Sequence, residues 1–210
     1  MTRTLSIHPD NPQPRLLRAA ADCLLEGGVL ATPTDACHAL VWRVGDRDAL
    51  ERVRRIRALD TRHLMTLICR DLAQMSVYAA MDTQQFRFVK EWTPGPYTFV
   101  LPATREVPKR LLHPSRRTLG ARLPQSPIVR GLLEALGEPL LGTTLQLPGD
   151  DQPLSEADEI EARLDGRIEL IIEGGHSGLE PTTLIDLTGE APLVVRIGCG
   201  PVEAMLGKRR

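Results

Sequence analysis

The amino-acid sequence predicts one α/β domain built on a twisted, mixed β-sheet with flanking helices. Three observations favour this fold class. Segments with the apolar spacing of helices alternate with short apolar segments along the whole chain. The connections are short, and some neighbouring strands are close enough to form hairpins. The length of 210 residues, 42% of them hydrophobic, is enough to bury a core. We predict a single domain over residues 1–210, with its core at about 14–200.

The predicted helices combine apolar residues three or four apart with recognisable ends. Gly27 ends the first helix, and Asp46 caps the second. Ser126, with a proline after it, opens the fourth. Ser155 and Asp158 stand at capping-box spacing at the start of the last. In chain order, helices are predicted over residues 14–26, 48–57, 83–91, 128–136 and 155–164.

The predicted strands are short apolar segments bounded by turn residues. Residues 149–153 form the only plausible linker, and we interpret them as a surface loop. In chain order, strands are predicted over residues 29–31, 38–44, 64–69, 97–101, 118–123, 139–144, 168–173, 182–187 and 193–197.

Composition excludes several classes of protein. No apolar run approaches the roughly 18 residues that span a bilayer, and the first residues lack a signal-peptide core, so we expect a cytoplasmic protein without membrane contact. The four cysteines form no CxxC pair, which argues against a structural zinc site, and Cys23 and Cys69 are expected in the core. Neither GxxxxGK[ST] nor GxGxxG after a strand is present, so a nucleotide site would need another construction.

The net charge of −1 hides an uneven distribution of charge. Residues 52–122 are rich in arginine, whereas residues 134–190 are strongly acidic. Arginine is suited to phosphate and carboxylate because its planar guanidinium binds either group bidentately. On composition alone, a solvated basic face is the preferred interpretation.

Arg122 is the strongest single signal of a polar cleft. It stands in a predicted strand on the opposite face from Leu119, Ala121 and Leu123, and a charge in an apolar strand needs a partner or a ligand. Arg55 and Arg57 end a predicted helix, where they either clamp a phosphate chain from an extended segment or complement the helix dipole.

Further polar groups follow other predicted strands. Thr144 and Gln146 alternate toward one face and offer a hydroxyl and an amide. Thr183 and Arg196 add another hydroxyl and another strand arginine. No Ser-His-Asp or Cys-His arrangement follows from spacing, and three histidines are expected to be solvated in loops. These are His8, His113 and His176.

The order of these motifs resembles the YrdC-like domain family over nearly the whole chain. The opening residues Ile7-His8-Pro9-Asp10-Asn11-Pro12 and the stretch Arg55-Ile56-Arg57 favour the YciO branch of that family. The motifs that carry the resemblance are, in order, Thr32-Pro33-Thr34-Asp35, Arg55-x-Arg57, Thr93-Pro94-Gly95-x-x-Thr98, Gly120-x-Arg122-x-Pro124, Thr143-Thr144-Leu145-Gln146, Pro181-Thr182-Thr183-Leu184-Ile185-Asp186 and Arg196-x-Gly198.

The resemblance implies a twisted α/β domain with a large concave basic surface. It also implies nucleotidyltransferase activity of the threonylcarbamoyl-AMP synthase type. In that reaction L-threonine, bicarbonate and ATP give threonylcarbamoyl-adenylate and pyrophosphate, and the product feeds the t6A modification of tRNA. ATP is then a substrate, Mg²⁺ accompanies it, and double-stranded RNA or tRNA is a possible partner.

Matching motif positions carry the family's roles onto this chain. Arg55 and Arg57 correspond to the Lys-x-Arg motif, as the catalytic pair that holds triphosphate and carboxylate. Thr34 corresponds to the threonine pocket. The remaining substrate contacts implied by the resemblance are His63, Arg122, Thr144, Gln146, Thr183 and Arg196.

The chain also departs from the family pattern. Arg55 replaces a lysine, and Thr144 and Gln146 enlarge a Ser-x-Asn pair. Asp35 and Ala36 replace Glu and Thr. These departures leave three readings open: a synthase of weak or altered substrate, an RNA-binding module without turnover, and a sensor of an amino acid or nucleotide.

Overall fold

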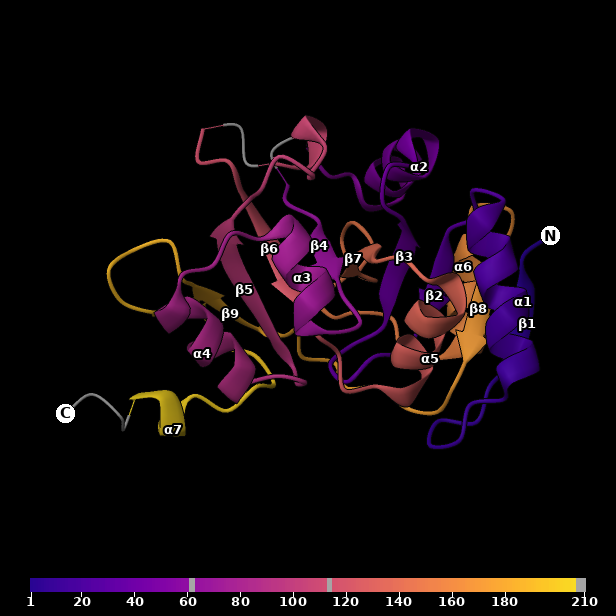
Figure 1. Cartoon of the computed structure of the whole chain (residues 1–210). Coiled ribbons are helices and arrows are strands. Elements are labelled where there is room, and N and C mark those ends of the chain that lie inside the picture. Colours follow the sequence, from indigo (N-terminus) through magenta and orange to yellow (C-terminus); the bar gives the residue numbers. More distant parts are fainter. Residues whose placement is uncertain (61–62, 113–114, 207–210) are drawn as a thin grey trace.

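One ten-stranded sheet runs through the part of the chain that the computed structural model describes, residues 1–60, 63–112 and 115–206 (Figure 1). The strand order is β1-β8-β2-β3-β7-β4-β6-β5-β9-β10. Parallel pairs such as β4–β6 and β5–β9 occur beside antiparallel pairs such as β3–β7 and β5–β6. The predicted mixed α/β fold is therefore confirmed.

The strands are short, as predicted, and most begin or end within two residues of the predicted bounds. They are β1 (Arg3–Ser6), β2 (Leu30–Thr32), β3 (Ala39–Arg43), β4 (Thr66–Ile68), β5 (Tyr97–Pro102), β6 (Thr118–Arg122), β7 (Leu140–Thr144), β8 (Leu170–Glu173), β9 (Thr183–Asp186) and β10 (Leu193–Arg196). The helices are α1 (Pro14–Leu25), α2 (Arg47–Arg57), α3 (Leu72–Tyr78), α4 (Thr83–Glu91), α5 (Pro127–Leu136), α6 (Ala157–Leu164) and α7 (Glu203–Leu206), with a 3₁₀ turn at Lys109–Leu111.

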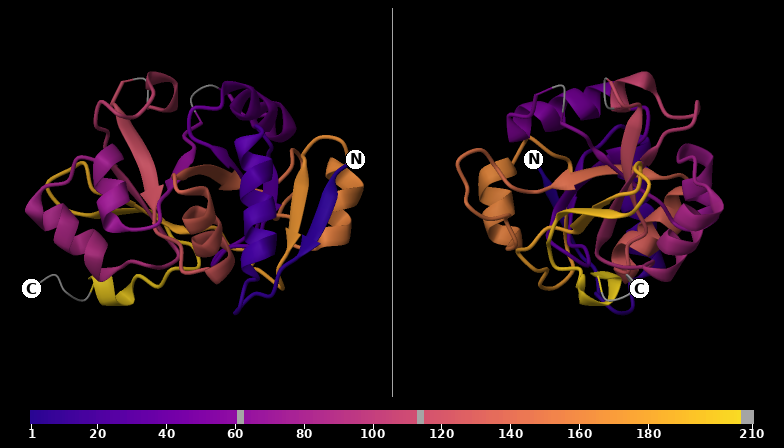
Figure 2. Two further views of the ribbon diagram at one scale, coloured as in Figure 1. Left: turned by 45° about the vertical axis from the view of Figure 1, so that its right-hand side comes forward. Right: turned by 90° about the vertical axis from the view of Figure 1, so that its left-hand side faces the viewer.

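Two hydrophobic cores lie on the two faces of the sheet because successive strand residues point to opposite faces. Leu67 and Leu141 join the larger core, to which helices α2, α3, α4 and α6 contribute. Val41 and Leu140 join the smaller core under α1 and α5, which lie side by side in Figure 1 and in the left view of Figure 2. The smaller core does not extend over β5 and β6, and that stretch of the face becomes the floor of the cavity described below.

Close contact between α1 and α5 depends on a glycine. A Cβ atom on Gly131 would lie 2.5 Å from Cδ1 of Leu17. That distance is shorter than any real contact, so with a larger residue here the side chain of Leu17 or the helix that carries it would have to shift.

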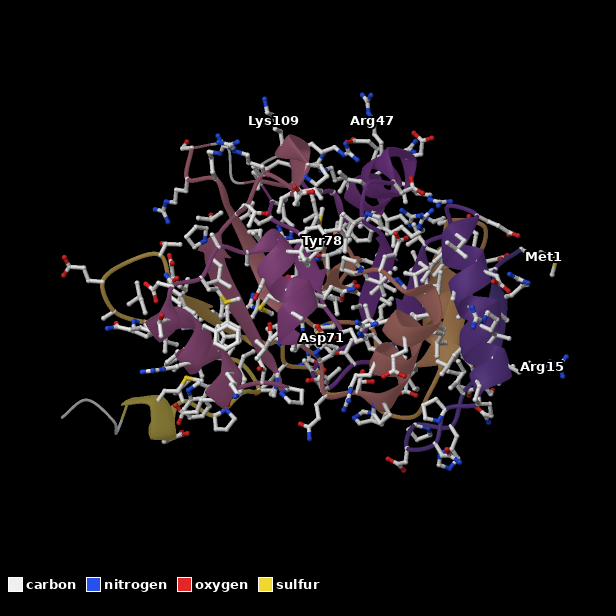
Figure 3. The ribbon with its side chains drawn as sticks, viewed as in Figure 1. Met1, Arg15, Arg47, Asp71, Tyr78 and Lys109 are labelled. Carbon is white, nitrogen blue, oxygen red and sulfur yellow. The ribbon has the colours of Figure 1, made fainter. Side chains whose placement is uncertain are left out.

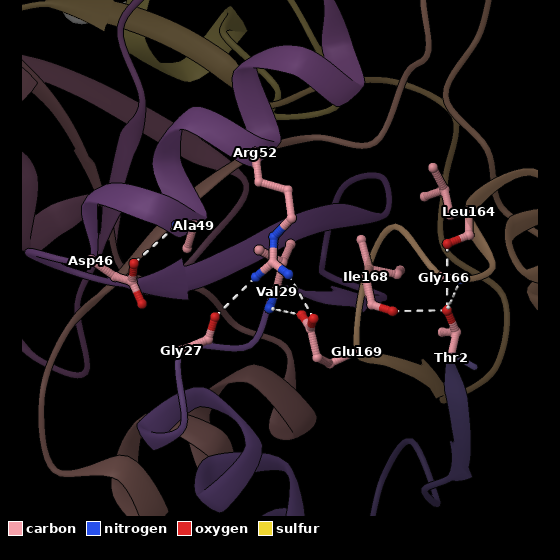
Figure 4. A network of polar contacts seen from close by, with 10 residues as sticks. All are labelled: Thr2, Gly27, Val29, Asp46, Ala49, Arg52, Leu164, Gly166, Ile168 and Glu169. Atoms are coloured by element: carbon pink, nitrogen blue, oxygen red, sulfur yellow. Dashed lines mark hydrogen bonds and ion pairs between the residues drawn. The ribbon is translucent and has the colours of Figure 1, made fainter.

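A charged network joins α2 to the sheet on the side away from that cavity (Figure 4). Arg52 donates to Oε1 of Glu169 at 2.6 Å and to the carbonyl of Gly27 at 2.9 Å. The other carboxylate oxygen of Glu169 accepts from the amide of Val29 at 2.8 Å. Every one of these contacts is structural, because each satisfies a main-chain group at the start of β2 or fixes α2 against it.

Some elements differ from the sequence prediction. Strand β1, helices α3 and α7 and the 3₁₀ turn were not predicted. Strand β1 depends on pairing with β8, which is distant in the chain, and α3 begins at a single cap, Asp71. The capping box predicted at Ser155 is wrong: α6 begins at Ala157, and the Ser155 hydroxyl donates to the Glu156 side chain instead. Cys23 and Cys69 are buried, as predicted. The prediction for His113 falls outside the described residues.

Among the described helices, none combines the length and the hydrophobicity that crossing a bilayer requires.

The cap of α2 gives the first testable prediction. Oδ1 of Asp46 accepts from the amide of Ala49 at 2.9 Å, a contact visible in Figure 4. We expect Asp46→Ala to lower the free energy of unfolding by about 1 kcal/mol, measured by denaturant titration, because a first-turn amide loses its acceptor. Asp46→Asn keeps an acceptor and should lose less than half of that. Equal losses in the two variants would contradict the cap.

Candidate functional site

A cavity of about 480 Å³ opens on the face of the sheet beside α5. Its floor consists of alternate residues of β4, β5, β6 and β7, the ones that do not enter the larger core. Thr66 stands opposite Gly120 on one side and Gly142 on the other, so two of three adjacent floor positions carry no side chain. The floor is lowered at Gly120, whereas Cδ1 of Ile68 covers Gly142, where a Cβ atom would lie 2.7 Å from it. The volume is typical of a small-molecule site.

Arg57, in the last turn of α2, lines the cavity. Its Nε donates to the Gln146 carbonyl at 2.7 Å, and its Nη1 donates to Oγ1 of Thr143 at 2.7 Å. No carboxylate among the described residues pairs with it, and burial lowers its pKa from the usual value for arginine. A guanidinium has five N–H groups. Within the described part of the chain, two of them have acceptors that fix the position of the side chain, which leaves up to three for an anion.

Arg122 lies in the wall at the end of β6, buried apart from 6% of its surface. Its Nη2 donates to Oδ1 of Asp35 at 2.5 Å, and Oδ2 of Asp35 accepts from the amide of Gln125 at 3.0 Å. Its Nε is buried without a hydrogen-bond partner in the described residues. Asp35 is therefore the partner that Arg122, as a charge in an apolar strand, requires. The Nε–H group of Arg122 is the donor that this pairing leaves unused.

Arg196 lines the cavity from β10, in an exposed position. Its Nη2 donates to the carbonyl of Thr182 at 2.9 Å. The hydroxyl of Thr182 lies 2.8 Å from that of Thr98 on β5, and both threonines also line the cavity. These contacts hold Arg196 at the rim without neutralising its charge.

Thr144, Gln146 and His63 complete the predicted residues that reach the cavity. The Thr144 hydroxyl lies 3.8 Å from the thiol of Cys37, whose pKa burial raises. Gln146 donates through its side chain to the carbonyl of Asp150 at 2.8 Å, which shapes the loop after β7. Burial and the nearby charge of Arg57 lower the pKa of His63, so its neutral form is favoured.

Three predicted site residues do not line the cavity. Helix α2 continues through Arg57, and residues two apart on a helix point to different faces, so Arg55 is exposed. The Thr34 hydroxyl closes a turn by donating to the Cys37 carbonyl at 2.8 Å. Thr183 is fully buried, and its hydroxyl donates to the Gly200 carbonyl at 2.6 Å.

Several lining residues were not predicted. Thr143 and Cys37 carry polar groups into the cavity, and residues 151–153, predicted as a surface loop, form part of its wall. Leu179 and Pro181 come from the segment before β9. The alternation of Thr98 with buried Tyr97 and Phe99 was a usable signal, whereas the loops are brought to the cavity only by the tertiary fold.

The described residues hold no group of three His, Cys, Asp or Glu side chains arranged for a metal ion. Asp151 is the one carboxylate among the described residues that line the cavity. A magnesium ion usually takes one or two carboxylates together with substrate phosphates. The donor set of the described residues therefore does not fit a resident magnesium site.

The sequence and the fold match a known family. Residues 22–198 match the family described as telomere recombination, Sua5–YciO–YrdC, and the chain belongs to it. The YciO protein of Escherichia coli K12 is 49% identical over 206 residues, covering 98% of this chain and all of that protein. The crystal structure of E. coli YciO superposes with a TM-score of 0.92 over 97% of this chain and 98% of that one.

A more distant relative carries a named activity. The threonylcarbamoyl-AMP synthase of Pyrococcus abyssi is 30% identical over 190 residues, which cover 89% of this chain and 55% of the synthase. A crystal structure of P. abyssi Sua5 complexed with L-threonine has a TM-score of 0.89 and 25% identity, covering 98% of this chain and 60% of that one. The resemblance to the YrdC-like family predicted from the motifs is thus confirmed.

Buried His38, next to Cys37, makes stability depend on pH. Burial lowers the pKa of His38 from 6.5 to about 4, against the opposing effect of Glu156 and with a small contribution from His176. Between about pH 7 and pH 4, His38 is protonated in the unfolded chain but neutral in the folded chain. The free energy of unfolding therefore falls as the pH drops through this range. The shift in the pKa of His38 corresponds to a loss of about 3 kcal/mol at most in the free energy of unfolding.

We expect His38→Gln to flatten this part of the pH profile of the unfolding free energy, because glutamine does not titrate. Denaturant titrations of both proteins at pH 7, 5.5 and 4 measure the difference. Parallel profiles would contradict a buried neutral His38.

Proposed function

We propose that the protein is a nucleotidyltransferase of the threonylcarbamoyl-AMP synthase type, acting on L-threonine or a similar small acid. The observation that carries the proposal is a cavity with three arginines against one lining carboxylate in the described residues, Asp151. Only Arg122 has a carboxylate partner there. A triphosphate and an amino-acid carboxylate supply the missing negative charge.

The proposed reaction requires positioning more than acid–base catalysis. The threonine amine attacks bicarbonate with loss of water, giving a carbamate. A carbamate oxygen then attacks the α-phosphorus of ATP, and pyrophosphate leaves. Holding the reactants in line and neutralising phosphate charge provide the rate enhancement. In this proposal Arg57 and Arg196, which both line the cavity, bind oxygens of the triphosphate, while Mg²⁺ arrives with ATP.

The relatives support the proposed class of substrate. The positions at which this chain departs from the family pattern concern the size of the acid that fits. A threonylcarbamoyl-AMP synthase is among the relatives, and a related structure holds L-threonine. In this chain the hydroxyl of Thr144 lies next to the thiol of Cys37, and the side chain of Gln146 donates to the carbonyl of Asp150. Both larger side chains line the cavity, which favours a small acid over a bulky one.

The decisive assay is pyrophosphate release from MgATP with bicarbonate and each of the twenty amino acids in turn. The proposal predicts release that depends on L-threonine or on another small amino acid, and on bicarbonate. Release with a bulky amino acid alone would reassign the substrate. No release with any amino acid would contradict synthase activity.

Arg57→Ala tests the role of the cavity. We expect MgATP affinity to fall at least tenfold by isothermal titration calorimetry, with little loss of stability, because Arg57 has no ion pair among the described residues to break. Arg55→Ala is the matched control on the same helix, and its affinity should change less than twofold because Arg55 lies outside the cavity. Equal losses of MgATP affinity in the two variants would contradict the role assigned to Arg57.

Arg122→Ala is a poorer test of the cavity, because it leaves Asp35 without its partner and destabilises the fold.

RNA binding is the second candidate, favoured by exposed basic side chains at one edge of the molecule. Arg47 and Lys109 point outward there (Figure 3), and Arg110 from the same edge donates to the Gly45 carbonyl at 2.5 Å. Binding by phosphate contacts predicts an affinity for tRNA that falls steeply between about 50 and 200 mM salt. Affinity that is unchanged by salt, or absent, would contradict this candidate.

A further inference from the structure

The segment between β8 and β9, residues 174–182, is a strap across the cavity side of the sheet. β8 and β9 lie toward opposite ends of the sheet in Figure 1, and six strands separate them in the strand order. Seven strand spacings on a flat sheet amount to about 33 Å. About ten residue steps reach roughly 33–36 Å at most. The strap therefore has little slack, although the twist of the sheet shortens its path.

The strap supplies part of the wall of the cavity. Leu179, Pro181 and Thr182 all line it. At its far end the strap is fixed by Thr182, through the hydroxyl of Thr98 and the side chain of Arg196. Any displacement of its middle would thus open the cavity beside Leu179, which is 38% exposed.

One buried polar contact fixes the middle of the strap. The Ser177 hydroxyl lies 2.5 Å from Nδ1 of His38, and these residues are only 3% and 2% exposed. The next residue of the strap reaches the same segment, because a Cβ atom on Gly178 would lie 2.9 Å from the Ala36 carbonyl. Solvent cannot replace a hydrogen bond at this depth, so loss of the Ser177 hydroxyl leaves Nδ1 unsatisfied.

His38 joins the strap to two further parts of the wall. Its neighbours Cys37 and Ala39 line the cavity, while its own side chain turns away to Ser177. Its carbonyl accepts from the amide of Leu145 at 2.8 Å, just before Gln146. The contact therefore couples the strap, the 36–39 segment and the end of β7.

We propose that the hydrogen bond between Ser177 and His38 is a positioning contact that holds the strap against the cavity and thereby sets the affinity of its ligand. It is not a hydrolytic Ser–His pair, because neither side chain is among the residues that line the cavity and both are buried. The expected effect on MgATP affinity rests on the proposed function, whereas the closure of the strap does not depend on it.

The test measures strap closure and ligand affinity separately. Hydrogen exchange without ligand is followed at two hydrogen-bonded amides that adjoin the strap and its contact, those of Leu145 and Thr183, which are called the strap amides below. Their exchange should be at least tenfold faster in Ser177→Ala than in the wild type, with α1 and α5 unchanged. Ser177→Thr keeps the hydroxyl and should restore slow exchange. Glu180→Ala, an exposed position of the same strap, is the control and should exchange like the wild type.

In the synthase assay, Ser177→Ala should raise KM for MgATP about tenfold and change kcat less than twofold, because the contact acts on closure and not on the reacting atoms. Unchanged strap exchange in Ser177→Ala, or a rise spread equally over α1 and α5, would overturn the proposal. Faster strap exchange in Ser177→Ala with an unaltered KM for MgATP would overturn the proposed link between strap closure and ligand affinity. A wild type that does not turn over would refute the proposed function, and the exchange data would still decide the strap.

Discussion

The buried ion pair between Arg122 and Asp35 is the constraint on which the cavity depends. A guanidinium with 6% exposure in the middle of a sheet is tolerated only with a partner at hydrogen-bond distance. Asp35 provides that partner from the turn before β3 and also accepts from the amide of Gln125 before α5. The pair thus joins three segments at the cavity wall, and it fixes where the turn residues 34–37 lie.

The remaining charge of the cavity follows from this pairing. Because Asp35 is committed to Arg122, it is unavailable to Arg57 and Arg196, which are held by neutral oxygens instead. Neutral anchors orient a guanidinium without cancelling its charge. The floor lowered at Gly120 then leaves room for an anion between walls with two arginines, Arg57 and Arg196, that no carboxylate of the described residues neutralises.

Local signals in the sequence predicted most of the fold and part of the site. Helix α4 has the predicted bounds, and the caps at Asp46 and Ser126 were predicted because capping depends on a few adjacent residues. Arg122 was found because a charge in an apolar strand conflicts with burial. Arg55 shows where prediction from local sequence stops. Whether its side chain reaches the cavity depends on whether helix α2 ends two residues earlier or later, and the spacing of apolar residues alone does not decide that.

The rest of the site depends on contacts between distant segments. Strand β1 is held by parallel pairing with β8, more than 160 residues away in the chain. The strap and the loop at 151–153 reach the cavity through the order of the strands, and no local pattern encodes that order.

A crystal structure grown with MgATP and L-threonine tests the central claim most directly. The account predicts nucleotide in the cavity, with triphosphate oxygens within hydrogen-bond distance of Arg57. Nucleotide bound elsewhere on the molecule, or a cavity without nucleotide at saturating concentration, would contradict it.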